Sequence, residues 1–241
     1  MKDVSGRAPI SVVIPTLDAA DRLPACLEAL VAACVGGLVR EVVVVDGGSS
    51  DATREIADGF GAKVLTAPPS RGGQLKAGAA AAAGDWLLFL HGDTMLAGDW
   101  GSEVQAFIEA EDENADSGRA GVFTLAFDAS GFAPRLVAAG AMARTRLLKS
   151  PYGDQGLLLS RRLYEAVGGF KDMPLFEDVD IVRRITRRGG RGALHVFKAK
   201  AITSAARYER GGYARRVVKN AWLLMRYHAG ASPEKLKESY R

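Results

Sequence analysis

Short strands and helices alternate through the first ninety residues, and this alternation constrains the fold more than any other feature. Continuous apolar segments, largely β-branched, are typical of strands covered on both faces. We expect four strands here: Ile10–Pro15, Glu41–Val45, Val64–Thr66 and Trp86–Leu90. We expect helices between them: Ala20–Val35, Ala52–Phe60 and, after a loop at Ser70–Gly73, Gln74–Ala83. This order predicts an α/β fold with a doubly wound, mostly parallel central sheet and helices on both faces.

The alternation weakens after Asp99. We expect helices over Gly98–Glu111, Pro134–Lys149, Arg161–Val167, Asp178–Arg188 and Tyr213–His228. We expect further strands over Gly121–Phe127, Gly156–Ser160 and Ala193–Val196. A chain of 241 residues that is 48% apolar can bury one large core. We therefore expect a single domain over residues 1–241, with a front half at about 8–98 and a back half at about 99–241.

The charge of the chain is +4 overall but unevenly spread, because Arg and Lys gather in Arg135–Lys149 and Arg183–Arg241. This pattern suits an anionic substrate or a membrane surface and does not require nucleic acid. No apolar run is long enough to span a bilayer, and the amino terminus lacks an apolar signal core. Cys26 and Cys34 are expected to be buried free thiols. A cytoplasmic location follows, with contact to the inner face of the membrane as an open alternative.

Several familiar motifs are missing from the sequence. It contains no G-x-G-x-x-G, no G-x-x-x-x-G-K, no H-E-x-x-H and no G-x-S-x-G. These absences argue against a dinucleotide-dependent dehydrogenase, a P-loop nucleotidase, a zinc protease and a hydrolase with a nucleophile elbow.

Carboxylates follow three of the expected strands: Asp18, Asp46 and Asp93. If the first, second and fourth strands lie side by side, these acids meet in the crevice at their carboxyl ends, where open α/β sheets bind ligands. Such acids repel one another unless they share a cation or accept hydrogen bonds. The ribose and base of a nucleoside diphosphate would donate such hydrogen bonds, and its diphosphate would bring a cation. His91 and Asp93 would suit a metal held against phosphate. Arg71, after the third strand, would meet the diphosphate or base, or would be a solvated loop arginine.

A second acidic group lies in Phe176–Asp180, with the sequence F-E-D-V-D. One interpretation is structural: Asp178 caps a helix, and its acidic neighbours favour the helix dipole. The other is catalytic: Asp178 acts as a general base that takes a proton from an acceptor hydroxyl. The sequence leaves both interpretations open.

The order of these motifs resembles that of the inverting family-2 glycosyltransferases of the GT-A fold, and most closely a branch of small, single-domain bacterial members. The resemblance covers roughly residues 8 to 210. The matching segments are Val12–Asp18, Val42–Asp51, Arg71–Gln74, Leu88–Thr94, Gly153–Gly156, Gly168–Phe170 and Phe176–Asp180. The front half would then bind a nucleotide-diphosphate sugar, and the back half would bind the acceptor.

The resemblance also implies roles for individual residues. Asp93 matches the last acid of the D-x-D motif, which binds the diphosphate and a divalent cation, Mg²⁺ or Mn²⁺; His91 replaces the first acid and is a second candidate metal ligand. Asp178 matches the base of the E-D motif, beside Glu177. The nucleoside pocket would be lined by Pro15, Thr16, Asp18 and Asp46. Base or diphosphate would contact Arg71 and Gln74.

The function expected from this resemblance is metal-assisted, inverting transfer of a hexose from a nucleotide-diphosphate sugar to a hydroxyl acceptor, with a lipid-linked acceptor as one option. Two rivals stay open: a sugar-phosphate nucleotidylyltransferase, and a catalytically silent nucleotide-sugar-binding protein. The amphipathic segment Tyr213–His228 either packs into the core or contacts a membrane surface. The sugar, the nucleotide, the acceptor and the oligomeric state do not follow from the sequence.

Overall fold

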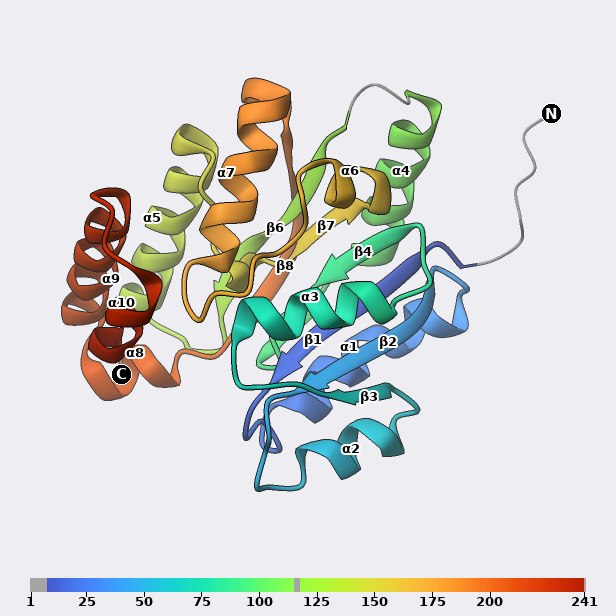
Figure 1. Ribbon diagram of the computed structural model, residues 1–241, viewed down its shortest axis with the longest axis horizontal. Helices are drawn as coiled ribbons and strands as arrows, with labels where there is room; N and C mark the ends of the chain where they lie inside the picture. The colour runs from blue at the N-terminus through green and yellow to red at the C-terminus, as the bar shows by residue number, and fades with distance from the viewer. Residues whose placement is uncertain (1–7, 115–117, 241) are drawn as a thin grey trace.

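One β-sheet runs through both halves of the chain (Figure 1). The computed structural model describes residues 8–114 and 118–240. The amino-terminal residues 1–7, which bear on the expected absence of a signal core, lie outside this part. Within it, the strands are β1 (Ile10–Thr16), β2 (Val39–Asp46), β3 (Lys63–Thr66), β4 (Trp86–Phe89), β5 (Thr94–Ala97), β6 (Ala120–Phe127), β7 (Leu157–Ser160) and β8 (Leu194–Thr203).

Within the described residues the eight expected helices are present with small shifts at their ends, and two further short helices, at Ala206–Gly211 and Pro233–Tyr240, were not predicted. Their bounds are α1 (Leu23–Val35), α2 (Thr53–Gly59), α3 (Arg71–Ala81), α4 (Trp100–Glu113), α5 (Phe132–Leu148), α6 (Arg161–Ala166), α7 (Glu177–Gly189), α8 (Ala206–Gly211), α9 (Tyr213–His228) and α10 (Pro233–Tyr240). The predicted loop at residues 70–73 is largely wrong, because α3 already begins at Arg71. Its first turn is held by a tertiary contact: the Gly72 N–H donates to the carbonyl of Met173.

The strand order β3-β2-β1-β4-β7-β6-β8-β5 confirms that the first, second and fourth strands lie side by side. These strands are parallel, and Thr16 of β1 pairs in register with Asp46 of β2. On the other side of β1, Val13 pairs with Phe89, so that His91 follows at the same edge of the sheet. The carboxyl ends of the three strands therefore form one edge.

The back half departs from a purely parallel arrangement. Strand β7 runs antiparallel to β4, with Leu157 opposite Phe89. The residues that precede β7 are therefore brought to the carboxyl end of β4. Strand β5, which the sequence did not predict, pairs antiparallel with β8. Its four residues follow the His91–Asp93 turn too closely to show a periodic pattern.

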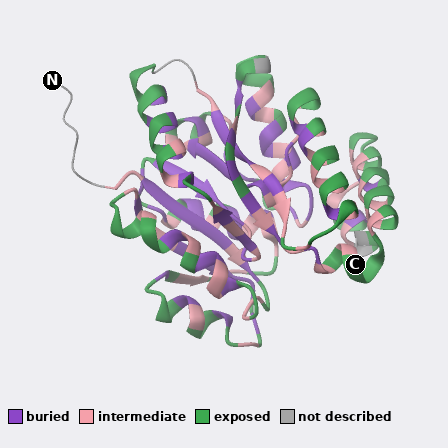
Figure 2. Cartoon of the chain, turned by 180° about the vertical axis from the view of Figure 1, so that it is seen from behind, coloured by how far each residue is buried: buried purple, intermediate pink, exposed green. Residues whose placement is uncertain are grey.

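Two apolar layers cover the two faces of the sheet. Alternate residues of β1 point to opposite sides: Val12 packs into a cluster with α1 and α4, and Val13 into a cluster with α3, α6 and α7. Figure 2 shows the strands buried and the outer faces of the helices exposed. Cys26 is buried in the first layer, as expected, but Cys34 is exposed, because it lies on the outward side of α1.

A third, smaller cluster joins the carboxyl-terminal helices to the start of α7. Leu223 of α9 and Leu236 of α10 pack against Leu175, Phe176 and Val179. Leu223 is the one fully buried residue of α9. Over residues 8–114 and 118–240, no helix combines the length and the apolar character needed to cross a bilayer.

Candidate active site

The turn after β2 is built around Asp46, which is fully buried. One carboxylate oxygen accepts hydrogen bonds from the backbone N–H groups of Gly48 (3.0 Å) and Ser49 (2.9 Å). The other accepts from the hydroxyl groups of Thr16 and Ser49. Burial alone would raise the pKa of the Asp46 carboxyl, but these hydrogen bonds outweigh burial and lower it. Asp46 therefore stays ionised and holds the β1 and β2 ends together.

Asp18 is satisfied in a similar way by a neighbouring turn. It adopts a left-handed backbone conformation (φ 48°), and one carboxylate oxygen accepts from the N–H (2.9 Å) and hydroxyl (3.1 Å) of Ser50. Its own N–H donates to the Ser49 hydroxyl (2.8 Å). Pro15 and Thr16 lie beside this network at the end of β1. The four residues predicted to line a nucleoside pocket thus share one edge, and their contact with a nucleoside stays a prediction.

Gln74 and Arg71 project from the first turns of α3. The buried Gln74 amide donates to the carbonyls of Thr16 and Val45, both at 2.8 Å, and so ties α3 to the same strand ends. The Arg71 side chain is about one-third exposed, and its Nε lies 3.6 Å from a carboxylate oxygen of Glu177. Arg71 therefore links the front half of the chain to the acidic segment of the back half.

The antiparallel pairing of β4 and β7 brings His91 against the Gly153–Gln155 turn. A Cβ atom at Gly153 would lie 2.5 Å from Nε2 of His91 and 3.4 Å from a carboxylate oxygen of Asp178. Only glycine fits between these two side chains. Segments that are far apart in the sequence, at residues 91, 153 and 178, therefore meet at one point.

Asp178 is oriented by backbone donors at the start of α7. One carboxylate oxygen accepts from Gly153 N–H (2.6 Å), and the other from Val179 N–H (2.7 Å). The prediction that Asp178 caps the helix is wrong, because α7 begins at Glu177 and Phe176 is its N-cap. The role of Asp178 as a general base stays a prediction. An ionised carboxylate has about four acceptor positions, so Asp178 keeps capacity for an acceptor hydroxyl.

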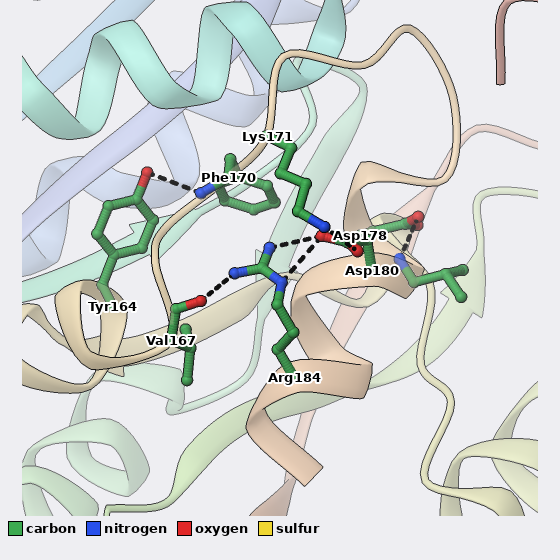
Figure 3. Close-up of polar contacts among 8 residues, drawn as sticks. Tyr164, Val167, Phe170, Lys171, Asp178, Asp180 and Arg184 are labelled. Atoms are coloured by element: carbon green, nitrogen blue, oxygen red, sulfur yellow. Dashed lines mark hydrogen bonds and ion pairs between the residues drawn. The ribbon is translucent and has the colours of Figure 1, made fainter. Parts of the chain in front are cut away.

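The neighbouring Asp180 has a different environment. Figure 3 shows Lys171 and Arg184 converging on its carboxylate, and Arg184 also donates to the carbonyl of Val167. The closest distances to Asp180 are 3.1 Å from Lys171 and 2.6 Å from Arg184. Asp180 therefore fixes the segment before α7 to the helix and is not positioned as a base.

Two further carboxyl groups, of the half-buried Asp154 and the buried Glu177, lie at this junction. One oxygen of Asp154 and one of Glu177 have no hydrogen-bond partner within the described part of the chain. Burial raises the pKa of Glu177 to about 7; Arg71 opposes this rise and Asp178 adds to it. Burial also raises the pKa of Asp154 to about 6, opposed by Arg144 and supported by Asp178 and Asp93. Both groups are therefore poised near neutral pH.

A small pocket opens at this junction, lined by residues from β4, the Gly153 turn and α7, including His91, Tyr152, Glu177 and Asp178. The sequence did not single out Tyr152 or Arg144, whose guanidinium carbon lies 3.5 Å from the centre of the Tyr152 ring. In the sequence, Arg144 was one of several basic residues of an amphipathic helix, and nothing distinguished it from the others.

The metal prediction can be tested against the donor groups around Asp93. The described residues contain no cluster of three or more His, Cys, Asp or Glu side chains suited to a metal ion. Burial, with Arg71 and Arg207 nearby, lowers the pKa of His91 well below its usual value and keeps the imidazole neutral, the form that binds metals. Metal binding by Asp93 and His91 therefore stays a prediction, and it requires that most of the cation's ligands come from a bound ligand and water, as is common for Mg²⁺.

The strand order and the surrounding helices are those of the GT-A fold, which solved glycosyltransferases share. The sequence model described as glycosyl transferase family 2 matches residues 11–138, which is more than half of the chain. The chain belongs to this family.

Relatives and solved structures agree with this assignment. The chain is 40% identical over 114 residues to a PGL/p-HBAD biosynthesis glycosyltransferase of Mycobacterium tuberculosis strain H37Rv, and 44% of this chain and 43% of that protein are covered. It therefore spans less than half the length of the curated relatives it matches. A glucosyl-3-phosphoglycerate synthase from M. tuberculosis, solved with Mn²⁺ and UDP-glucose, superposes with a TM-score of 0.58 at 20% identity and covers 88% of this chain and 77% of that one. This likeness is one of fold.

Proposed function

We propose that this protein transfers a hexose from a nucleotide-diphosphate sugar to a hydroxyl acceptor with inversion at the anomeric carbon. The observation that carries the proposal is the meeting of Asp178, Glu177 and Asp154 with His91 at the carboxyl end of β4. This junction joins the donor-side edge of the sheet to the acceptor-side helices, as a group-transfer reaction between two substrates requires.

Asp178 is the general base of the proposed reaction. Its carboxylate accepts the proton of the acceptor hydroxyl while the acceptor oxygen attacks the anomeric carbon. The bond from that carbon to the diphosphate oxygen breaks on the opposite face, so a single displacement inverts the configuration. The N–H groups of Gly153 and Val179 hold the carboxylate in one orientation, and such positioning of a reacting group contributes substantially to rate.

The donor is assigned to the edge formed by β1, β2 and β4. Pro15, Thr16, Asp18 and Asp46 would shape the nucleoside pocket, and Arg71 and Gln74 would lie toward the base or diphosphate. Asp93, with His91 beside it, would hold a Mg²⁺ or Mn²⁺ ion against the diphosphate, where the cation offsets the negative charge of the leaving group. The solved relative that contains Mn²⁺ and UDP-glucose supports this choice of ligands.

The acceptor is assigned to the side of the junction formed by Tyr152, Asp154 and α7. One buried oxygen of Asp154 and one of Glu177 lack a hydrogen-bond partner in the part of the chain that the structure describes, which costs free energy. Hydroxyl groups of a bound substrate would donate the missing hydrogen bonds. A lipid-linked hydroxyl acceptor, reached through peripheral contact with the inner face of the cytoplasmic membrane, completes the proposal.

The proposal is tested first with donor binding and turnover. Thermal-shift and calorimetric titrations with a panel of nucleoside diphosphates and their sugars, with and without Mn²⁺, should reveal one preferred donor. NMR of the transfer or hydrolysis product then reports its anomeric configuration. Retention of configuration would contradict the displacement, and donor binding without any turnover would favour the silent binding protein.

The variant Asp93→Ala tests the role of Asp93 in donor binding separately from any role in folding. It should weaken Mn²⁺-dependent donor binding at least tenfold while the melting temperature stays within about 2 °C. Asp85→Ala, a change at an exposed carboxylate away from the junction, serves as the matched control and should bind donor normally. Equal donor affinity in Asp93→Ala and the unmodified protein would contradict the assignment of this residue.

A further inference from the structure

Helix α9 turns most of its apolar side chains to the solvent. Val218, Trp222 and Met225 are 68%, 45% and 63% exposed, whereas Leu223 on the opposite side is buried. Their spacing of four and three residues places them on one stripe of the helix. Of the two alternatives left open for this segment, packing into the core is therefore wrong for most of its apolar residues, and the exposed stripe needs another explanation.

A row of cations borders this stripe. Arg215, Lys219 and Arg226 lie four and seven residues apart on the adjoining side of α9, and the Arg226 guanidinium carbon lies 4.8 Å from the centre of the Trp222 ring. The helix contains no Asp or Glu. An apolar stripe flanked by Lys and Arg, with Trp at the boundary, is typical of a helix that lies in the surface of a membrane.

Helix α5 repeats this pattern. Phe132, Leu136 and Leu147 share one side of the helix and are 79%, 58% and 80% exposed. Arg135 and Arg146 adjoin them, and this helix also lacks acidic residues. Helix α5 packs against α9, and the two lie at one edge of the molecule (Figure 1), with long exposed stretches visible from behind (Figure 2).

We propose that the exposed apolar and basic sides of α5 and α9, here called the α5–α9 face, bind the surface of a bilayer that contains anionic lipids. Charge complementarity favours an anionic bilayer as the binding partner of this face. Two copies of the chain joined through this face would bring the cations of four acid-free helices together, whereas anionic headgroups would neutralise them. The apolar side chains would enter the boundary between headgroups and acyl chains.

The α5–α9 face lies beside the elements that form the candidate active site, which relates membrane contact to catalysis. This part of the inference rests on the proposed function. Helix α9 adjoins the start of α7 through the stacked rings of Tyr227 and Phe176, 4.9 Å apart. Helix α5 adjoins the Gly153 turn through a hydrogen bond between Thr145 and Gln155 (2.8 Å). Docking by α5 and α9 would hold the acceptor side of the junction near the membrane, within reach of a lipid-linked hydroxyl.

The binding is tested with sedimentation of the full chain on phosphatidylglycerol–phosphatidylcholine vesicles and on vesicles of phosphatidylcholine alone, without donor or acceptor. Trp222 is a built-in reporter, because Trp86 and Trp100 are buried. We expect binding at least tenfold tighter to the anionic vesicles, weakening as salt is raised from 0.1 to 0.5 M, with a blue shift of Trp222 emission.

Two variant proteins separate the apolar and basic contributions. Val218→Glu with Met225→Glu, and Arg215→Gln with Lys219→Gln, should each lower anionic-vesicle binding at least tenfold. Val31→Glu with Val35→Glu on α1, at positions 47% and 84% exposed, is the matched control and should bind as the unmodified chain does. None of these positions is buried, so the melting temperatures should be preserved.

Three outcomes would overturn the inference: no vesicle binding, equal binding by all variants, or equal binding to phosphatidylcholine alone. A dimer in sedimentation velocity that Val218→Glu with Met225→Glu dissociates would assign the face to a second copy instead. Donor hydrolysis measured without vesicles reports separately on the proposed function. Intact donor hydrolysis without vesicle binding would therefore contradict only the membrane contact. Vesicle binding without donor hydrolysis would contradict only the proposed transferase activity.

Discussion

Two pairs of acidic residues, one pair in each half of the molecule, have opposite environments. In the front half, Asp18 and Asp46 accept hydrogen bonds from backbone and hydroxyl groups of the turn that follows β2. In the back half, Glu177 is buried and Asp154 is half-buried, and each has one buried oxygen that lacks a hydrogen-bond partner among the described residues. The direction of the pKa follows this difference, because hydrogen bonds lower it for Asp46 and burial raises it for the other two.

The difference indicates what each half contributes. Satisfied carboxylates stabilise the turns that shape one wall of the crevice before any ligand arrives. A buried polar group without a partner costs about 1–3 kcal/mol, and such groups persist mainly at functional sites. The back-half carboxyl groups would recover this cost on contact with a substrate. The contrast predicts that substitution of Asp46 damages stability, whereas substitution of the acidic residues at the Asp178 junction damages turnover.

The largest expected effect is on turnover, in Asp178→Asn. An amide cannot take the proton of the acceptor hydroxyl, so kcat should fall roughly 10²–10⁴-fold. Donor affinity should change little, but the melting temperature should fall, because the amide NH2 group replaces one of the two oxygens that accept from the Gly153 and Val179 N–H groups. Steady-state kinetics with donor titration and a thermal scan measure all three. A variant with normal kcat would remove Asp178 from the mechanism.

The second prediction concerns stability, in Asp46→Ala. The change leaves the N–H groups of Gly48 and Ser49 without their acceptor, and we expect a loss of about 3 kcal/mol in the free energy of unfolding. Urea denaturation measures it. Asp21→Ala, at an exposed carboxylate, should stay within about 0.5 kcal/mol of the unmodified protein. If the two variants are equally stable, the hydrogen bonds of Asp46 do not stabilise the front half as the contrast requires.

The third prediction uses the raised pKa of Glu177, about 7 in the folded protein. Between its unfolded pKa and pH 7 the folded state holds a proton that the unfolded state has released, so this group makes stability fall as pH rises. Glu177→Gln removes that dependence. From pH 4.5 to 8, the variant should gain about 2–3 kcal/mol in unfolding free energy relative to the unmodified protein.

The measurement is urea unfolding at several pH values, and the comparison of the two proteins cancels the other titrating groups. Glu109→Gln, on the exposed side of α4, is the matched control and should show no such gain. A constant difference between the Glu177→Gln and unmodified proteins across this range would mean that Glu177 titrates normally.

Much of the front half could be predicted from the sequence, because its signals are local. Continuous apolar segments with polar turns gave the parallel strands and their carboxyl-terminal edge, and the structure confirms that β1, β2 and β4 are neighbours. The motif order also led to the family. The hydrogen bonds inside the turns were not predicted, since they depend on backbone geometry rather than on residue type alone.

The back half was harder to predict because its site depends on long-range pairing. The contact between His91 and Gly153 follows from the antiparallel alignment of β4 and β7, and no local pattern reveals the direction of a strand. The exposed side of α9 is a similar case. Its amphipathic pattern is the same whether the apolar side faces a core or the solvent, and only the packing of Leu223 decides between them.

The smallest expected effect is at Tyr227, which touches no reacting group. Its ring stacks on Phe176 with centres 4.9 Å apart and planes 29° apart, and Phe176 has a left-handed backbone (φ 65°) that is strained for a residue with a side chain. This stack holds the residue immediately before Glu177 and Asp178. Tyr227→Ala should lower kcat several-fold and cost about 1 kcal/mol of stability, whereas Tyr227→Phe should keep both.

Tyr213→Ala is the matched control, because it removes another stacked ring of α9, against Tyr208, away from α7. It should reduce stability by a similar amount and leave kcat unchanged. If Tyr213→Ala and Tyr227→Ala reduce kcat equally, the stack has no specific role in positioning Asp178. A loss of kcat in Tyr227→Ala alone would instead show that the carboxyl-terminal helices help to position Asp178. These helices lie beyond the segment matched by the family model.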